Sequence, residues 1–363
     1  MDDFFPDDFF YEILLRIPAK DLLRFKSVCK SWNLLISDKF FAIAHLSYSK
    51  LEILLALGQP KSQKNRVINF FTLNQQDNNL IKFALEDNQL LLKSACDGMV
   101  FLQCYHDCGK IFIYNWVTRQ LKRLPPPPED CSRFVLFLDD SIQKYKVFGI
   151  QQYTTAITTM ECFMITQGDT DWRFVYSIAS EDKGQVKGIT CVEKELHWTA
   201  RQDKFSTNYV LYLYSMDIAS EEVAKVEIPF EMTNYHALGQ VRGSLSIVSK
   251  CETHVEIRSL ADKATNHWII VCNIDVESIV SPLLSGEPKL SNWSRKLYQF
   301  AYMDDIDSDT YSDRMKILIP FEDRLYMYDM EKKDLSEIVI PSKIENLFIW
   351  RVLPRKSSLV NWE

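Results

Sequence analysis

The stretch that decides the N-terminal fold runs from Phe5 to Trp32 and reads FPDDFFYEILLRIPAKDLLRFKSVCKSW. Its apolar residues recur every three or four positions, which is the spacing of one face of an α-helix. A first helix is predicted over residues 7–17, because acidic groups in its first turn complement the helix dipole and Pro18 cannot continue it. Its apolar stripe contains Phe9, Phe10, Ile13, Leu14 and Ile17.

Two further short helices follow in the same segment. The second is predicted over residues 20–25, and the third carries an apolar stripe of Val28, Trp32, Leu35 and Ile36. A segment of roughly 45 residues cannot easily bury this many large apolar side chains within itself. Some of them must therefore cover another surface, either on a partner protein or on the rest of the same chain.

The pattern changes from about Arg66 onward. Short runs rich in Val, Ile, Phe, Tyr and Trp alternate with turn residues, as in segments 110–114 and 324–328. A loose phrase of strand, polar turn and strand recurs mostly every 40 to 50 residues or so, a spacing typical of propeller blades. The stretch 275–298 breaks this rhythm and is predicted to be an insertion or a long connection. The phrase occurs at 113–125, 161–174, 211–229, 255–271 and 325–341.

Composition argues against several classes of function. The chain has 363 residues and a formal net charge of -7, without a Lys/Arg run that could bind phosphates, so nucleic acid is not an expected partner. Its longest apolar runs, 51–57 and 315–321, are far shorter than the roughly 20 residues that span a bilayer, so no membrane passage is expected. The acidic start does not fit a signal peptide, and nine scattered cysteines fit reduced side chains in an intracellular protein.

The motifs of common enzymes are missing from the sequence. There is no Gly-x-Gly-x-x-Gly, Walker phosphate loop, Gly-x-Ser-x-Gly elbow or His-Glu-x-x-His motif, and only ten glycines occur. We therefore expect neither catalytic residues nor a cofactor, although dispersed catalytic groups would leave no such signature.

Two groups of potential metal ligands have simpler explanations. Cys104, His106 and Cys108 lie close in sequence, but a structural zinc site needs a fourth ligand, so a polar hairpin tip is favoured. The acidic stretch 304–313 lacks the glycine and the last glutamate of an EF-hand loop, so a solvated loop is favoured. The proline run 125–128 is predicted to be an extended connector rather than an SH3 ligand. No metal site is expected.

The N-terminal segment resembles an F-box of the plant type. The matching residues are FPDD at 5–8, EILLRIPAK at 12–20 and LLRFKSVCKSW at 22–32. The resemblance implies that this segment docks on a Skp-family adaptor. It places the adaptor-binding residues at Phe5, Pro6, Ile13, Leu14, Pro18, Leu22, Leu23, Val28 and Trp32.

Most of residues 66–350 resemble the F-box-associated domain of plant F-box proteins, a kelch-like relative of β-propellers. The matching residues, in chain order, are CDGMV at 96–100, NWVTRQ at 115–120, RLP at 123–125, YKV at 145–147, DWR at 171–173, LHW at 196–198, MDI at 216–218 and GSL at 243–245. The resemblance implies radial blades that hold recognition loops rigidly around a central funnel.

The predicted architecture is an α+β multidomain protein. A small three-helix F-box occupies residues 1–47, a linker residues 48–65, and an all-β propeller-like domain of about six blades residues 66–363.

The resemblance implies a non-catalytic subunit of an SCF (Skp–cullin–F-box) E3 ubiquitin ligase, which binds a target protein for ubiquitination and proteasomal degradation. The expected partners are a Skp-family adaptor, a cullin reached through it, and a target that one sequence does not identify. The expected location is the cytoplasm, the nucleus or both. The alternatives are a propeller scaffold whose F-box binds the adaptor outside a complete ligase, and a propeller enzyme with an ionisable cluster in its funnel.

Overall fold

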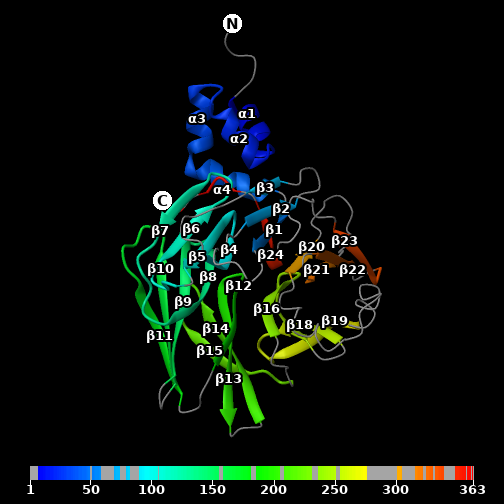
Figure 1. Cartoon of the computed structure of the whole chain (residues 1–363). Helices are drawn as coiled ribbons and strands as arrows, with labels where there is room; N and C mark the ends of the chain where they lie inside the picture. Colours follow the sequence, from blue (N-terminus) through cyan, green and yellow to red (C-terminus); the bar gives the residue numbers. More distant parts are fainter. Residues whose placement is uncertain are drawn as a thin grey trace.

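The computed structural model shows four helices followed by antiparallel sheets (Figure 1). The structure describes residues 7–49, 51–58, 69–73, 79–81, 90–104, 106–154, 158–180, 185–204, 208–230, 236–250, 254–275, 301–304, 315–321, 324–329, 332–338, 348–356, 358–360 and 362. The predicted break at 275–298 and nearly all of the acidic stretch 304–313 lie outside these residues. No helix in the described ranges is long and apolar enough to cross a membrane.

The helical head contains four helices where three were predicted. They are α1 (Asp7–Leu15), α2 (Ala19–Phe25), α3 (Lys30–Ser37) and α4 (Lys39–Tyr48). The three predicted helices are confirmed, but the chain forms a fourth one because Asp38 caps it. The carboxylate Oδ1 of Asp38 accepts hydrogen bonds from the backbone N–H groups of Phe40 (2.9 Å) and Phe41 (3.0 Å), which satisfies donors that a helix start leaves unpaired.

Helix α4 closes the bottom of the head. Its Phe41, Ala42, His45 and Leu46 are buried. The Nε2 of His45 donates to the carbonyl oxygen of Ile17, 2.7 Å away, just beyond the end of α1. Burial lowers the pKa of His45, which the hydrogen bond to Ile17 only partly opposes.

The described strands form six four-stranded antiparallel sheets. One sheet joins the two ends of the chain, with its strands in the order β24 (Phe348–Lys356), β1 (Leu51–Gly58), β2 (Asn69–Leu73) and β3 (Asn79–Ile81). The next two sheets consist of β4 (Leu90–Cys96), β5 (Met99–Cys104), β6 (Ile111–Asn115) and β7 (Gln120–Arg123), then β8 (Cys131–Asp139), β9 (Lys144–Thr154), β10 (Thr158–Thr166) and β11 (Arg173–Ser180).

The remaining three sheets repeat this order of consecutive strands. They consist of β12 (Gln185–Val192), β13 (Glu195–Lys204), β14 (Asn208–Asp217) and β15 (Val223–Glu227); of β16 (His236–Val241), β17 (Ser244–Lys250), β18 (His254–Asp262) and β19 (His267–Asp275); and of β20 (Ala301–Asp304), β21 (Met315–Phe321), β22 (Arg324–Asp329) and β23 (Asp334–Ile338).

The sheets close into a ring through one edge strand each. Strand β4 contacts β8, β8 contacts β12, and the series continues through β16, β20 and β24 back to β4. This radial closure is the architecture of a β-propeller. The predicted order of a helical head followed by an all-β propeller is therefore confirmed.

The predicted linker at residues 48–65 is wrong over Leu51–Gly58. These residues form β1, which pairs with β24 from Leu51 opposite Lys356 to Gly58 opposite Phe348. The apolar run ILLAL gains two antiparallel neighbours, because β1 also pairs with β2. The head is thus joined to the propeller directly, since α4 ends at Tyr48 and β1 begins at Leu51.

Short capped turns connect the third and fourth strands in several sheets. Asn115 Oδ1 accepts from the backbone N–H of Val117 (2.8 Å), and Asp217 Oδ1 accepts from that of Ser220 (2.7 Å). Asp262 does the same for its own turn. Such side-chain acceptors hold a tight turn where the backbone has no strand partner. In these three sheets they explain the polar turn of the recurring sequence phrase.

The largest apolar cluster crosses from the head into the propeller. It contains Leu14, Leu22 and Phe41 from the helices together with Met99 and Phe101 from β5. It also includes Leu359, Val360 and Trp362 near the end of the chain. The head and the β4–β7 sheet therefore share one core.

Candidate functional site

The surface of the helical head is unusually apolar. Of the large apolar side chains that are exposed in the described part of the chain, half lie in residues 7–48. Leu34 and Phe40 are the most exposed, at 74% and 76%. A concentration of exposed large apolar side chains in so short a segment favours an interaction site on the head. The head members are Phe9, Ile13, Val28, Leu34, Phe40 and Tyr48.

Aromatic side chains hold the first three helices together beneath this surface. The rings of Phe10 and Trp32 are 6.1 Å apart, and those of Phe25 and Trp32 are 5.6 Å apart. Phe9 contacts Phe10 at 6.4 Å, and Ile13 lies one helical turn after Phe9. Trp32 thus links α1, α2 and α3 while its own side chain remains only half-buried.

The predicted adaptor-binding residues fall into four groups. Ile13, Pro18 and Val28 are exposed, and Leu23 and Trp32 are half-buried. Leu14 and Leu22 are fully buried, at 0% exposure. Phe5 and Pro6 lie outside the described residues.

Leu14 and Leu22 require a correction to the predicted surface. Their side chains form part of the core shared with the propeller and are fully buried in the isolated chain. On a helix, consecutive residues are rotated by about 100°, so Ile13 can point outward while Leu14 points inward. The apolar stripe of α1 is wide enough to include both directions, which is why the spacing alone did not separate them.

Four exposed apolar residues of the head were not in the predicted set: Phe9, Leu34, Phe40 and Tyr48. Phe9 belongs to the predicted stripe of α1, one turn before Ile13, and that spacing could have identified it. Leu34 and Phe40 each precede a more buried apolar neighbour, Leu35 and Phe41. Such apolar pairs carry no sequence signal for which member faces solvent.

Charged side chains are also exposed on the head. Lys20, Arg24 and Lys30 are exposed, and Arg24 lies 3.4 Å from Asp21 on the same helix. Burial lowers the pKa of Lys26, which is half-buried. The head thus exposes both apolar and charged side chains, a mixture that protein–protein interfaces contain.

A second arrangement in the propeller has the residue types of a hydrolase. On β13, His197 Nδ1 lies 2.8 Å from Ser215 Oγ on β14, and His197 Nε2 lies 3.6 Å from Glu195 Oε2. Burial lowers the pKa of His197 to about 4, against the opposing effect of Glu195. Both His197 and Ser215 are buried.

The geometry of this trio does not suit a reaction. Ser215 stands directly opposite His197 in the strand pair, so the backbone N–H groups around it belong to the sheet and cannot stabilise an oxyanion. The trio is a cross-strand contact inside the sheet. Among the described residues there is also no group of His, Cys, Asp and Glu side chains that could hold a metal ion.

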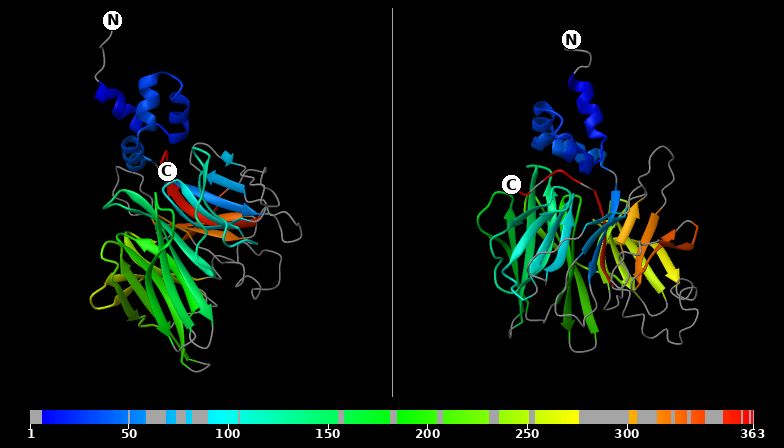
Figure 2. Two further views of the ribbon diagram at one scale, coloured as in Figure 1. Left: turned by 90° about the vertical axis from the view of Figure 1, so that its left-hand side faces the viewer. Right: turned by 45° about the horizontal axis from the view of Figure 1, so that its top comes forward.

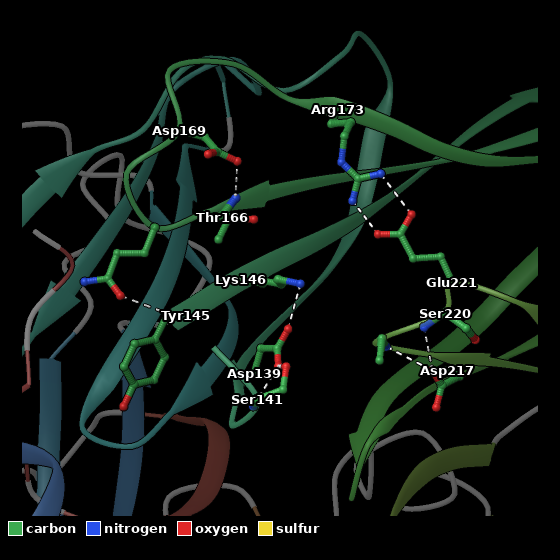
Figure 3. Close-up of polar contacts among 12 residues, drawn as sticks. Asp139, Ser141, Tyr145, Lys146, Thr166, Asp169, Arg173, Asp217, Ser220 and Glu221 are labelled. Carbon is green, nitrogen blue, oxygen red and sulfur yellow. Dashed lines mark hydrogen bonds and ion pairs between the residues drawn. The ribbon is translucent and has the colours of Figure 1, made fainter. Parts of the chain in front are cut away.

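Ion pairs in the propeller join strands both between sheets and within one sheet (Figure 3). Arg173 at the start of β11 makes a bidentate pair with Glu221, which lies in the turn between β14 and β15. Nearby, Lys146 Nζ lies 2.7 Å from Asp139 Oδ2, and both side chains are buried. Burial acts to raise the pKa of Asp139, but hydrogen bonds from Lys146 and Ser141 outweigh it and leave that pKa low.

The other predicted features of the propeller also have structural explanations. Residues 106–110 connect β5 to β6, as expected of a hairpin tip, and the Gln103 side chain donates to the Cys108 carbonyl oxygen over 3.0 Å. The proline run connects β7 to β8, and Trp172 Nε1 donates to the Pro125 carbonyl oxygen over 3.1 Å. Both segments are therefore connections between strands that side-chain hydrogen bonds hold in place.

Known proteins resemble the chain over both regions. Residues 4–43 match the F-box domain family, and residues 55–279 match the family of the F-box associated beta propeller domain. The F-box protein At5g49610 of Arabidopsis thaliana is 24% identical over 306 residues, which cover 76% of this chain and 80% of the relative. The putative F-box protein At1g47790 of the same plant is 26% identical over 278 residues, 73% of this chain and 70% of the relative.

The matched regions coincide with the two parts of the structure. The F-box match spans α1 to α3 and the start of α4, and the propeller match begins inside β1. F-box domains generally bind adaptors of the Skp type, and F-box proteins are generally non-catalytic adaptors of ubiquitin ligases. The chain belongs to the plant F-box proteins that carry an F-box associated β-propeller domain.

Proposed function

We propose that the protein is the substrate-recognition subunit of an SCF E3 ubiquitin ligase. The observation that carries the proposal is the exposed apolar surface of the head, which lies within the segment that matches the F-box family. In this function the head binds a Skp-family adaptor and, through it, a cullin. The propeller binds a target protein, which is then ubiquitinated and degraded by the proteasome.

The mechanism of such a subunit is tethering. A target held on the propeller meets the ubiquitin-charged enzyme at a high effective concentration, so its lysines react without any bond chemistry on this chain. The proposed location is the cytoplasm, the nucleus or both, where adaptor and cullin would be available to an intracellular chain.

The test is co-purification with a Skp-family adaptor. In an Ile13→Asp, Val28→Asp double variant, two exposed apolar side chains become charged, so the interface would bury unpaired carboxylates and binding should fall by about 100-fold or more. The matched control is Ile142→Asp in the propeller, where the side chain is similarly exposed at 49%. The control should bind like the wild type, and circular dichroism should show that all variants fold.

Two results would count against the proposal. If the wild type does not bind the adaptor, the head is a structural cap on the propeller. If it binds the adaptor but no cullin joins the complex, the second candidate applies: a propeller scaffold that uses its F-box outside a complete ligase.

A further inference from the structure

The described residues near the end of the chain are buried between the helical head and the propeller. After β24, the chain runs beneath α4 and across the edge of the β4–β7 sheet (Figures 1 and 2). Ser358 has no exposed surface, and Leu359, Val360 and Trp362 are also buried. We refer to Ser358, Leu359, Val360 and Trp362 as the C-terminal segment.

One side chain of the propeller holds the backbone of this segment. Asn115 Nδ2 donates to the carbonyl oxygens of Ser358 (3.0 Å) and Val360 (2.6 Å). The Oδ1 of the same amide accepts from the turn N–H groups of Val117 and Thr118. Asn115 therefore has two separable tasks, because its oxygen caps a turn and its nitrogen binds the C-terminal segment.

A glycine gives the segment room to approach the sheet. Gly98, in the turn between β4 and β5, has φ +84°, and a Cβ there would lie 2.6 Å from Ser358 Cβ and 2.8 Å from its backbone nitrogen. Gly243 occupies the equivalent turn between β16 and β17 with φ +78°, but a Cβ there would have nothing within 4 Å. Both glycines follow a residue with positive φ, Asp97 or Arg242. The two turns share a backbone and differ in what covers them.

The other side of the segment faces the helices. Leu359, Val360 and Trp362 belong to the same apolar cluster as Leu14 and Leu22 of the head. Just before the segment, Lys356 Nζ donates to the carbonyl oxygen of Leu46 at the end of α4, over 3.3 Å. The segment therefore contacts the head and the propeller at once.

We propose that the C-terminal segment is a clamp that fixes the orientation of the helical head on the propeller. The covalent connection between Tyr48 and Leu51 is a single point, about which the head could turn. The clamp supplies a second point of attachment, and two points prevent a hinge motion. If the head binds an adaptor as proposed above, the clamp sets the direction in which the propeller presents its target.

The experiment measures the distance between head and propeller in the isolated chain. Among the described residues, the exposed thiols are Cys29 in the head and Cys108 in the propeller. Nitroxide labels on these two, in a Cys251→Ser background with labelling confirmed by mass spectrometry, report the distance by pulsed electron paramagnetic resonance. The wild type should give one narrow distribution, and a chain that ends at Lys356 should give a broad one.

Point variants separate the clamp from general damage. Gly98→Ala should broaden the distribution, whereas Gly243→Ala, with the same backbone strain and an open space, should leave it narrow. Asn115→Asp keeps the turn-capping oxygen and loses the two donated hydrogen bonds, so amides of the segment should exchange about 10-fold faster or more. If Gly98→Ala does not fold, the Asn115→Asp variant carries the distance test.

A narrow, unshifted distribution in both the truncated chain and Asn115→Asp would overturn the proposal. Because the measurement needs no adaptor, this outcome is independent of whether the head binds one. Conversely, a chain that fails to bind an adaptor can still show the clamp.

Discussion

The helical head leaves large apolar side chains in solvent, whereas the propeller buries most of its own between neighbouring sheets. Within 42 or so residues the head exposes Phe9, Ile13 and Phe40 among others, as many large apolar groups as the described part of the much longer propeller. The propeller instead packs Phe148, Trp198 and their neighbours in a closed ring. A module this small cannot bury all of its large apolar side chains within itself, and those left exposed support the proposed contact with another protein.

Exposure of charged pairs also differs between an ion pair of the head and one of the propeller, this time with the exposed pair in the head and the buried pair in the propeller. In the head, Arg16 and Glu12 lie 2.6 Å apart with both side chains more than half exposed. In the propeller, the side chains of Lys146 and Asp139 are only 11% and 6% exposed. Exposed pairs contribute little to stability, but a buried pair that loses one member leaves an uncompensated charge. The comparison therefore predicts that deleting one member of the buried Lys146–Asp139 pair lowers stability far more than deleting Arg16 or Glu12.

The largest effect is expected for Lys146→Met. Methionine fills a similar volume but leaves the Asp139 carboxylate buried without its cation, which should lower the free energy of unfolding by roughly 3–5 kcal/mol. Urea unfolding at neutral pH measures the loss. The control is Arg173→Met, whose side chain is 54% exposed in its pair with Glu221, and it should cost about 1 kcal/mol or less. Equal losses in the two variants would show that burial does not decide how much each ion pair contributes to stability.

The next-largest effect distinguishes Leu22 from Val28, both of which the sequence analysis assigned to the adaptor-binding surface. Leu22→Ala removes a fully buried side chain from the shared core and should destabilise the head by about 3 kcal/mol. Val28→Ala, at 61% exposure, should change stability by less than about 0.5 kcal/mol and weaken adaptor binding instead. Helical circular dichroism during unfolding and adaptor affinity are the two readouts. Loss of adaptor affinity without destabilisation in Leu22→Ala would return that residue to the interface.

Local patterns were sufficient to predict the elements of each region. The expected strands at 110–114 and 324–328 correspond to β6 and β22, and the helix expected at 20–25 corresponds to α2. These predictions succeeded because periodicity and side-chain type act within a few residues. The helix expected to reach Ile17 ends at Leu15, because Pro18 disfavours the helical conformation of the residue before it.

Long-range contacts were beyond the reach of the same patterns. Leu51–Gly58 becomes a strand because β24, almost three hundred residues later, supplies its neighbour. The role of Gly98 depends on Ser358, and that of the Asn115 amide depends on two carbonyl groups near the end of the chain. For the site, spacing identified the apolar faces of the helices, but which half of each face lies inside depends on packing against the propeller.

A smaller effect concerns pH and lies wholly in the propeller. Burial lowers the pKa of His197 to about 4, from an ordinary value near 6.5. Between these two values the unfolded chain binds a proton that the folded chain does not, so stability rises with pH in this window and is lost as pH falls. Acidification from about pH 7 to about pH 5 should remove about 2 kcal/mol of stability through this residue.

The check is a comparison of urea midpoints for wild type and His197→Gln at both pH values. Glutamine does not titrate, so the variant should lose less stability on acidification than the wild type does. Glu195 and Lys263, which also face the imidazole, remain in both proteins and act as internal controls. Identical pH dependence in the two proteins would show that folding does not lower the pKa of His197.

The smallest effect tests the helix that the sequence analysis did not predict. Asp38→Ala removes the oxygen that accepts from Phe40 and Phe41, and it should cost about 1 kcal/mol by fraying the first turn of α4. Asp38→Asn retains a capping oxygen and should cost only a few tenths of that amount, because Asn caps as well as Asp. Hydrogen exchange of the α4 amides is the measurement. Since α4 carries His45 and Leu46, which face Ile17 and Lys356, faster exchange should begin at Phe40 and fade toward the clamped end of the helix. Uniform acceleration along α4 would mean that the cap, and not the contacts at its far end, holds the helix on the propeller.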